Sequence, residues 1–149
     1  MASKQYHPPA SSDQVRERMQ AQPRRDTKCE MAVRSAVHAL GLRYRVHQRP
    51  EPDLRREADL VFRTDKIAVF VDGCFWHGCP EHHSPPTTHY HWWEAKIGKN
   101  RARDKETDRL LAGCGWTVVR IWEHEDPAEA AKRVWDAVLA RRQERKDTK

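Results

Sequence analysis

The sequence has no long apolar stretch. Its hydrophobic runs fall well short of the roughly 20 residues that a membrane-spanning helix needs. Residues 1–14, MASKQYHPPASSDQ, contain no apolar segment of the kind that a secretion signal carries. We therefore expect a cytoplasmic protein with no membrane partner.

Cysteine is also scarce, with four in 149 residues. Small secreted proteins that depend on disulfides carry cysteine at higher density, so the chain does not have the composition of a disulfide scaffold. In a reducing compartment, a close pair of cysteines beside histidines favours a metal site over a disulfide.

Positive charge, by contrast, is present in excess, with a formal net charge of +6. A basic chain of this size suits a polyanionic partner, although many soluble proteins are basic without one. Six tryptophans strengthen the nucleic-acid interpretation, because aromatic side chains can wedge between bases or stack on them.

The hydrophobic pattern predicts one α/β domain built around a single mixed sheet. A first helix is expected within 26–41, where Thr27-x-x-Glu30 resembles a capping box and Gly41 a helix stop. Further elements follow in the order strand, strand, strand, helix, strand, helix, over residues 42–47, 58–62, 66–72, about 91–112, 116–122 and from 127.

The expected organisation divides the chain into a domain and two tails. Residues 1–13 are polar and predicted to be a disordered tail, and 14–140 form the domain. Within the domain, the arginine-rich segment 14–25 is either a basic arm or a solvated extension. Residues 141–149 are expected to be a charged, fraying end.

Metal-ligand residue types are densest in the stretch GCFWHGCPEHH, which begins at Gly73. Cys74, Cys79 and His82 are spaced so that one loop can wrap one ion, and structural zinc takes four Cys or His ligands. His124 follows the last predicted strand and is a candidate fourth ligand. His83 competes with His82, and lone histidines are more often surface residues.

Carboxylates in unexpected places suggest a second, catalytic metal. Asp59 interrupts the apolar strand ADLVF and needs a partner there, for which Mg²⁺ is a natural candidate. Asp72 ends the next predicted strand and would lie near Asp59 if the two strands pair. It could instead be an ordinary turn carboxylate.

A histidine beside a carboxylate is a plausible general base. His77 lies within the cysteine-rich loop, and Asp104 lies on the long helix, on the same face as Trp93. Asp104 could instead form an ion pair with an arginine. Glu30 could belong to the capping box alone.

Several of these blocks occur in the order and spacing of a known family. RMQAQPRRDTKCE, ADLVF, VFVDGCFWHGCPEHH, WWEAKIGKNRARD and GWTVVRIWEHE resemble the very-short-patch repair (Vsr) DNA mismatch endonucleases over about residues 15–130. The resemblance implies a fold like that of the PD-(D/E)xK restriction endonucleases, with a structural zinc. It also implies Mg²⁺-dependent nicking of duplex DNA on the 5′ side of the T of a T·G mismatch, which arises by deamination of 5-methylcytosine.

The resemblance assigns roles to individual residues. Those implied for catalysis and Mg²⁺ binding are Asp59, the backbone carbonyl of Val71, His77 as the water-activating base, Asp104 behind it and Glu30 through metal-bound water. Those implied for wedging beside the mismatch are Phe75, Trp76 and Trp93. Those implied for zinc are Cys74, Cys79, His82 and His124. The N-terminal arm would close over a DNA groove.

The chain departs from the enterobacterial pattern of the family at a few of these positions. That pattern has Thr where this chain has Val71 and His where it has Asp72, which could add a carboxylate to the metal site or be inert. It also has His in place of Cys79 and Cys in place of His124; zinc accepts either type.

Other functions fit the same residues. One is an endonuclease with a broader mismatch range or a restriction-like site. Another is a zinc-stapled DNA-binding module without catalysis, against which the combination of Asp59, His77 and Asp104 argues. The resemblance further implies a repair polymerase and mismatch-repair proteins as partners and association with the nucleoid during repair. We expect a monomer, since a single nick needs one active site.

Overall fold

The computed structural model describes residues 26–74, 77, 79 and 88–148. The predicted tail 1–13 and arm 14–25 lie outside this part of the chain. No helix among the described residues is both long and apolar enough to cross a membrane.

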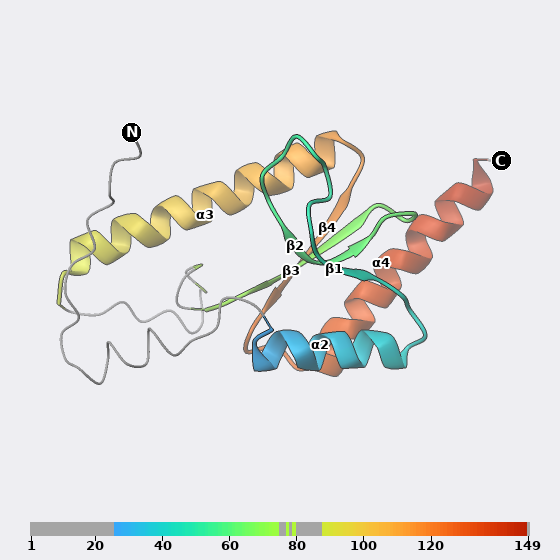
Figure 1. The fold of residues 1–149 in the computed structure, drawn as a ribbon, viewed down its shortest axis with the longest axis horizontal. Coiled ribbons are helices and arrows are strands. Elements are labelled where there is room, and N and C mark those ends of the chain that lie inside the picture. The colour runs from blue at the N-terminus through green and yellow to red at the C-terminus, as the bar shows by residue number, and fades with distance from the viewer. Residues whose placement is uncertain (1–25, 75–76, 78, 80–87, 149) are drawn as a thin grey trace.

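Four strands form one mixed sheet in the order β1-β2-β3-β4 (Figure 1). Strand β1 (Arg45–Gln48) pairs antiparallel with β2 (Ala58–Phe62), and β2 pairs antiparallel with β3 (Ile67–Asp72). Strand β4 (Thr117–Trp122) lies parallel to β3. A parallel pair requires a crossover, which helix α3 (Tyr90–Gly113) supplies.

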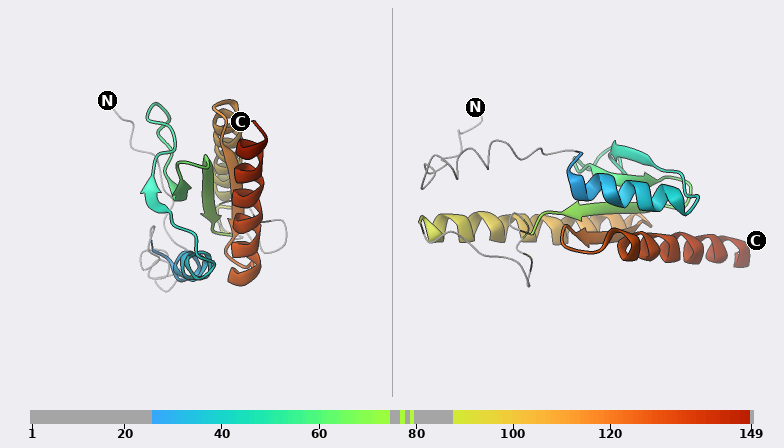
Figure 2. Two further views of the ribbon diagram at one scale, coloured as in Figure 1. Left: turned by 90° about the vertical axis from the view of Figure 1, so that its right-hand side faces the viewer. Right: turned by 90° about the horizontal axis from the view of Figure 1, so that it is seen from below.

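Helices α2 (Lys28–Ala39) and α4 (Pro127–Asp147) pack together against one face of the sheet (Figure 2). Both helices begin at the predicted caps. The Oγ1 of Thr27 accepts a hydrogen bond from the N–H of Glu30, and Asp126 caps α4. The buried side chains between these helices and the sheet include Val33, Val37, Leu60, Val69, Ile121, Val134 and Val138.

The opposite face of the sheet is covered by the C-terminal part of α3. Leu111 and Trp116 are buried there against Val61, Ala68 and Phe70. The N-terminal half of α3 extends past the end of the sheet (Figure 1). The predicted order of elements and the single mixed sheet are therefore confirmed.

Two predicted boundaries are wrong. The first strand begins at Arg45 rather than residue 42. Residues 141–147, expected to fray, continue α4, because Arg142 and Arg145 both bind Asp65, which is 4% exposed in the β2–β3 turn. A charged segment stays helical here because its arginines have a buried counter-charge.

Candidate active site

The site lies at the end of the sheet where the antiparallel strands β2 and β3 carry the acidic residues Asp59 and Asp72. Side chains alternate along a strand, so Asp72 shares a face with Phe70. Because Phe70 packs in the cluster under α3, Asp72 faces the side of the sheet that α3 covers, whereas Asp59 shares a hydrogen bond with Glu30 of α2. Asp59 is the second residue of β2 and Asp72 ends β3, which places them at the same end of the sheet.

Asp59 is the acidic residue of the site that lacks a positively charged partner among the described residues. Its Oδ2 accepts a hydrogen bond of 2.7 Å from the backbone N–H of Val71. Burial and a hydrogen bond shared with Glu30 raise the pKa of Asp59 to about 7. Among the described residues, no Lys, Arg or His forms an ion pair with Asp59. The fold thus places the carboxyl group of Asp59, beside that of Glu30, in a buried position that suits a bound metal cation.

Mg²⁺ fits these groups, because it is a hard cation that takes oxygen ligands and keeps several of its waters. The Asp59 carboxylate and the Val71 carbonyl lie on neighbouring strands, which pair antiparallel. Glu30 reaches the same position from the first turn of α2. Its side chain therefore contributes to the site, while the cap of the helix is made by Thr27.

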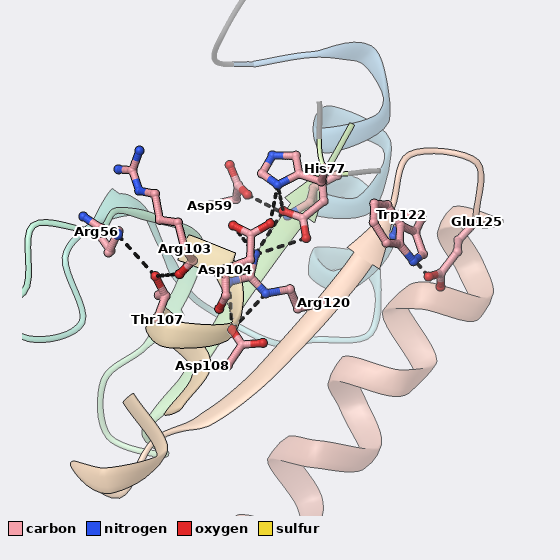
Figure 3. Close-up of polar contacts among 12 residues, drawn as sticks. Arg56, Asp59, His77, Arg103, Asp104, Thr107, Asp108, Arg120, Trp122 and Glu125 are labelled. Atoms are coloured by element: carbon pink, nitrogen blue, oxygen red, sulfur yellow. Dashed lines mark hydrogen bonds and ion pairs between the residues drawn. The ribbon is translucent and has the colours of Figure 1, made fainter. Parts of the chain in front are cut away.

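His77 and Asp104 form the second part of the site (Figure 3). The Nδ1 of His77 is in close contact with Oδ2 of Asp104, and its backbone N–H donates to the carbonyl of Gly73. Burial lowers the pKa of His77, but the hydrogen bond with Asp104 and the charge of Asp72 outweigh it, so the net shift is upward. With Nδ1 held by Asp104, Nε2 is the nitrogen left for a substrate or water.

Asp72 is held by an arginine that the sequence reasoning missed. The Nη1 of Arg120 lies 3.2 and 3.1 Å from the two carboxylate oxygens of Asp72 and 3.5 Å from Oδ1 of Asp104. The Nη2 donates to Asp108 at 2.7 Å and to the Asp104 carbonyl. The guanidinium also stacks on Phe70, 4.3 Å from the ring centre. Asp72 therefore belongs to an ion-pair network beside His77.

A signal for Arg120 was present in the sequence. It interrupts the apolar strand WTVVRIW, as Asp59 interrupts ADLVF. A charge on a buried strand needs a partner of opposite sign, and Asp72 on the adjacent strand provides it: Asp72 pairs in register with Trp122, two residues beyond Arg120. The alternative that Asp104 forms an ion pair with an arginine is also correct, alongside its contact with His77.

Three of the four zinc candidates, Cys74, Cys79 and His124, lie together beyond the ends of β3 and β4. Cys74 Sγ lies 3.2 Å and Cys79 Sγ 3.6 Å from Nδ1 of His124. Tetrahedral zinc with ordinary bond lengths separates a sulfur and a nitrogen ligand by roughly 3.5 Å. Burial and the neighbouring Cys79 thiol raise the pKa of Cys74 to about 11 in the metal-free site. These donors fit a zinc ion that would take the thiols as thiolates.

Several predicted residues lie outside the described part of the chain. These are the aromatic residues Phe75 and Trp76, the zinc candidate His82 and its competitor His83. Trp93 is described. It lies in the part of α3 that extends past the sheet, half-buried, with its ring edge-on to Trp92 at 4.8 Å.

Comparisons with known proteins find similar endonucleases and nicking enzymes. The family model for the DNA mismatch endonuclease Vsr matches residues 9–83. The type II nicking enzyme V.NaeI of Lentzea aerocolonigenes is 42% identical over 139 residues, which are 92% of this chain and 83% of that protein. The DNA mismatch endonuclease Vsr of Escherichia coli (strain K12) is 35% identical over 70% of this chain and 66% of its own length.

Among solved structures, the catalytic domain of the homing endonuclease I-Bth0305I superposes with a TM-score of 0.52, at 15% identity, over 78% of this chain and 98% of that one. This similarity supports a shared fold. The matches in sequence show that the chain belongs to the Vsr family of DNA mismatch endonucleases.

Proposed function

We propose that this protein is a Mg²⁺-dependent endonuclease that nicks duplex DNA on the 5′ side of the T in a T·G mismatch and so begins very short patch repair. The observation that carries the proposal is that a buried acidic group suited to a metal ion and a histidine–aspartate pair lie near each other. A buried Asp59, which shares a hydrogen bond with Glu30 and has no basic partner among the described residues, lies at the same end of the sheet as a His77–Asp104 pair.

His77 is the proposed general base. Asp104 holds Nδ1 and so fixes the ring, which leaves Nε2 to accept a proton from the attacking water. The water oxygen forms a bond to phosphorus as one ester P–O bond breaks, the proton of the water passes to Nε2, and the leaving oxygen takes a proton from solvent to become a hydroxyl group. The contact with Asp104 also stabilises the imidazolium that results.

Mg²⁺ would be held by the Asp59 carboxylate, the Val71 carbonyl and, through water, Glu30; it would stabilise the charge that develops on the phosphate. Asp59 is oriented for this role by the hydrogen bond from the Val71 N–H. The chain provides no basic side chain in contact with Asp59 among its described residues, so the cation would meet an uncompensated carboxylate.

Mismatch recognition is assigned to Phe75, Trp76 and Trp93. Wedging aromatic rings into a base stack costs a few kcal/mol. The cost is lower at a wobble pair, so the same wedge favours a mismatch over a normal pair. A zinc held by Cys74, Cys79, His124 and His82 would fix the loop that carries Phe75, Trp76 and His77.

The two metals would keep to their own sites because their ligands differ. Thiolates and imidazoles suit Zn²⁺, whereas carboxylate and carbonyl oxygens suit Mg²⁺. We propose further that the protein acts as a monomer in the cytoplasm at the nucleoid, and that a repair polymerase and mismatch-repair proteins follow it.

A nicking assay tests the proposal. Purified protein is incubated with Mg²⁺ and end-labelled duplexes that carry each mismatch in several sequence contexts, with a fully paired duplex as control. We expect a nick 5′ to the T of T·G, and no nick by Asp59→Ala protein that still binds mismatched DNA. Cleavage of other mismatches at the same rate would replace T·G specificity with a broader range, and binding without any cleavage would favour a DNA-binding module.

A further inference from the structure

Glu30 has two basic neighbours that the proposed chemistry does not use. Arg34 lies one turn further along α2, and His47 lies on β1. The Nη2 of Arg34 and the Nε2 of His47 are each 3.4 Å from Oε1 of Glu30. The same Nη2 is 2.7 Å from His47 Nε2 and 2.7 Å from Oδ1 of Asp26.

This group contains metal-ligand residue types, but its positive charge is already supplied by Arg34. Asp26, Glu30 and His47 present their ligand atoms within 4.8 Å of one another. The guanidinium of Arg34 contacts all three. A cation of the chain itself therefore neutralises the group.

The contacts to Glu30 are shielded from water. The side chain of Glu30 is 4% exposed, and those of Arg34 and His47 are 13% and 15% exposed. Charges at 3.4 Å interact far more strongly in such surroundings than on the surface. Without Arg34, the buried carboxyl groups of Glu30 and Asp59 would face each other with much less positive charge nearby.

His47 adopts a backbone conformation that is uncommon for residues other than glycine. Its φ is +50°, in the left-handed region where few non-glycine residues lie, mostly Asn, Asp and His. Its neighbours Val46 and Gln48 pair with Leu60 and Ala58, so His47 falls opposite Asp59. Strained residues of this kind tend to occur at functional sites. The imidazole ring, placed by this backbone, reaches Glu30.

We propose that Arg34 and His47 are positioning residues that hold the Glu30 carboxylate in place beside Asp59. Both act through Glu30, and no described contact joins either of them to His77 or Asp104. The inference rests on the proposed function, because the role of Glu30 there is to approach the bound cation. It goes further by assigning the orientation of Glu30 to two residues of this chain.

The first test is a double-mutant cycle on the nicking rate. At saturating DNA and Mg²⁺, we expect Arg34→Met to lower kcat by roughly 10- to 100-fold with KM for DNA unchanged, as misplacement of a catalytic group does. In a Glu30→Gln background the same change should cost less than about twofold, because the group it positions is already altered. Equal losses in both backgrounds, or a raised KM with unchanged kcat, would overturn the proposal.

Arg45→Met is the matched control. Arg45 is an exposed arginine of β1, and among the described residues it forms no ion pair with Glu30. Its replacement removes the same charge from the same region and should leave kcat within about twofold of the wild-type value.

The second test uses unfolding of the zinc-loaded protein without Mg²⁺, and so needs no activity. Arg34→Met should lower Tm, and the decrease should be clearly smaller when Glu30 is Gln, because the buried carboxylate that Arg34 neutralises has been removed. An equal decrease in both backgrounds would mean that Arg34 stabilises the fold independently of Glu30. This cycle still reports on the contact if wild-type protein nicks no duplex, which would reject the proposed function itself.

His47→Asn separates positioning from folding. Asn, like His, tolerates a positive φ, and it is too short to provide the same ring contact. We expect a Tm close to the wild-type value together with a loss of roughly 3- to 10-fold in kcat. A wild-type kcat in this variant would remove His47 from the positioning role.

Discussion

The two acidic parts of the site differ in how their charge is balanced. Asp72 and Asp104 are held by Arg120 and lie beside His77. Asp59 contacts no basic side chain among the described residues, and its pKa is raised to about 7. This difference shows that carboxylates close together in space can suit different chemical roles. The balanced side suits proton transfer, and the unbalanced side suits a metal ion.

The balanced side is tested most strongly by His77→Ala. Loss of a positioned general base should reduce the nicking rate by on the order of 10² to 10⁴ and leave the affinity for mismatched duplex unchanged. Single-turnover kinetics with labelled DNA would measure this. The exposed His38 provides a matched control, since His38→Ala should nick normally. A loss below tenfold for His77→Ala would remove His77 from the role of base.

The position of His77 relative to Asp59 depends on the loop that carries His77. Cys74→Ser should release zinc and lower the free energy of unfolding by more than about 2 kcal/mol, as loss of a structural metal does. Metal analysis and thermal unfolding would measure both effects. Cys114→Ser, at an exposed cysteine, should change neither. Native protein that contains no zinc would reject this part of the proposal.

On the unbalanced side, the buried Asp59 carboxylate should lower the stability of the protein when no cation is bound. Because the folded pKa of Asp59 is raised from 3.8 to about 7, the folded protein holds a proton that the unfolded chain releases above pH 4. Stability is then full below about pH 4 and falls as the pH rises towards 7. In Mg²⁺-free, zinc-loaded protein, Asp59→Asn should therefore raise the free energy of unfolding by on the order of 1–3 kcal/mol at pH 8 and less at pH 6.

Unfolding curves of the two proteins at both pH values would provide the comparison. Both would share any effect of pH on zinc, so their difference isolates Asp59. Asp53→Asn, at an exposed acid, should show no such difference. Destabilisation by Asp59→Asn at pH 8 would mean that Asp59 is already compensated in the metal-free protein.

Asp72→Asn should have the smallest effect. Arg120 keeps its contacts with Asp104 and Asp108, and an amide oxygen can still accept a hydrogen bond from the guanidinium. We expect a nicking rate within about threefold of wild type and a stability loss of about 1 kcal/mol. Asp108→Asn makes the same change at another partner of Arg120 and serves as control. A rate loss of 100-fold at Asp72 alone would make it part of the metal site.

Local sequence determined much of the fold. The caps at Thr27 and Asp126 satisfy N–H groups of their own helices, and the apolar strands 58–62 and 67–72 follow their hydrophobic pattern. The positions of Asp59 and His77 could also be selected in advance, because a charge on an apolar strand or a histidine in a cysteine-rich loop is conspicuous in the sequence itself.

The tertiary structure decided which charges balance one another. Asp72 appeared as a candidate metal ligand, but its partner Arg120 lies 48 residues away and meets it only because β3 and β4 are parallel neighbours. The fraying end became helix for the same reason, since Asp65 lies 80 residues from Arg145. Residue type and spacing along the chain determined the candidate groups, whereas Coulomb interaction depends on distance in space, which only the packed sheet and helices set.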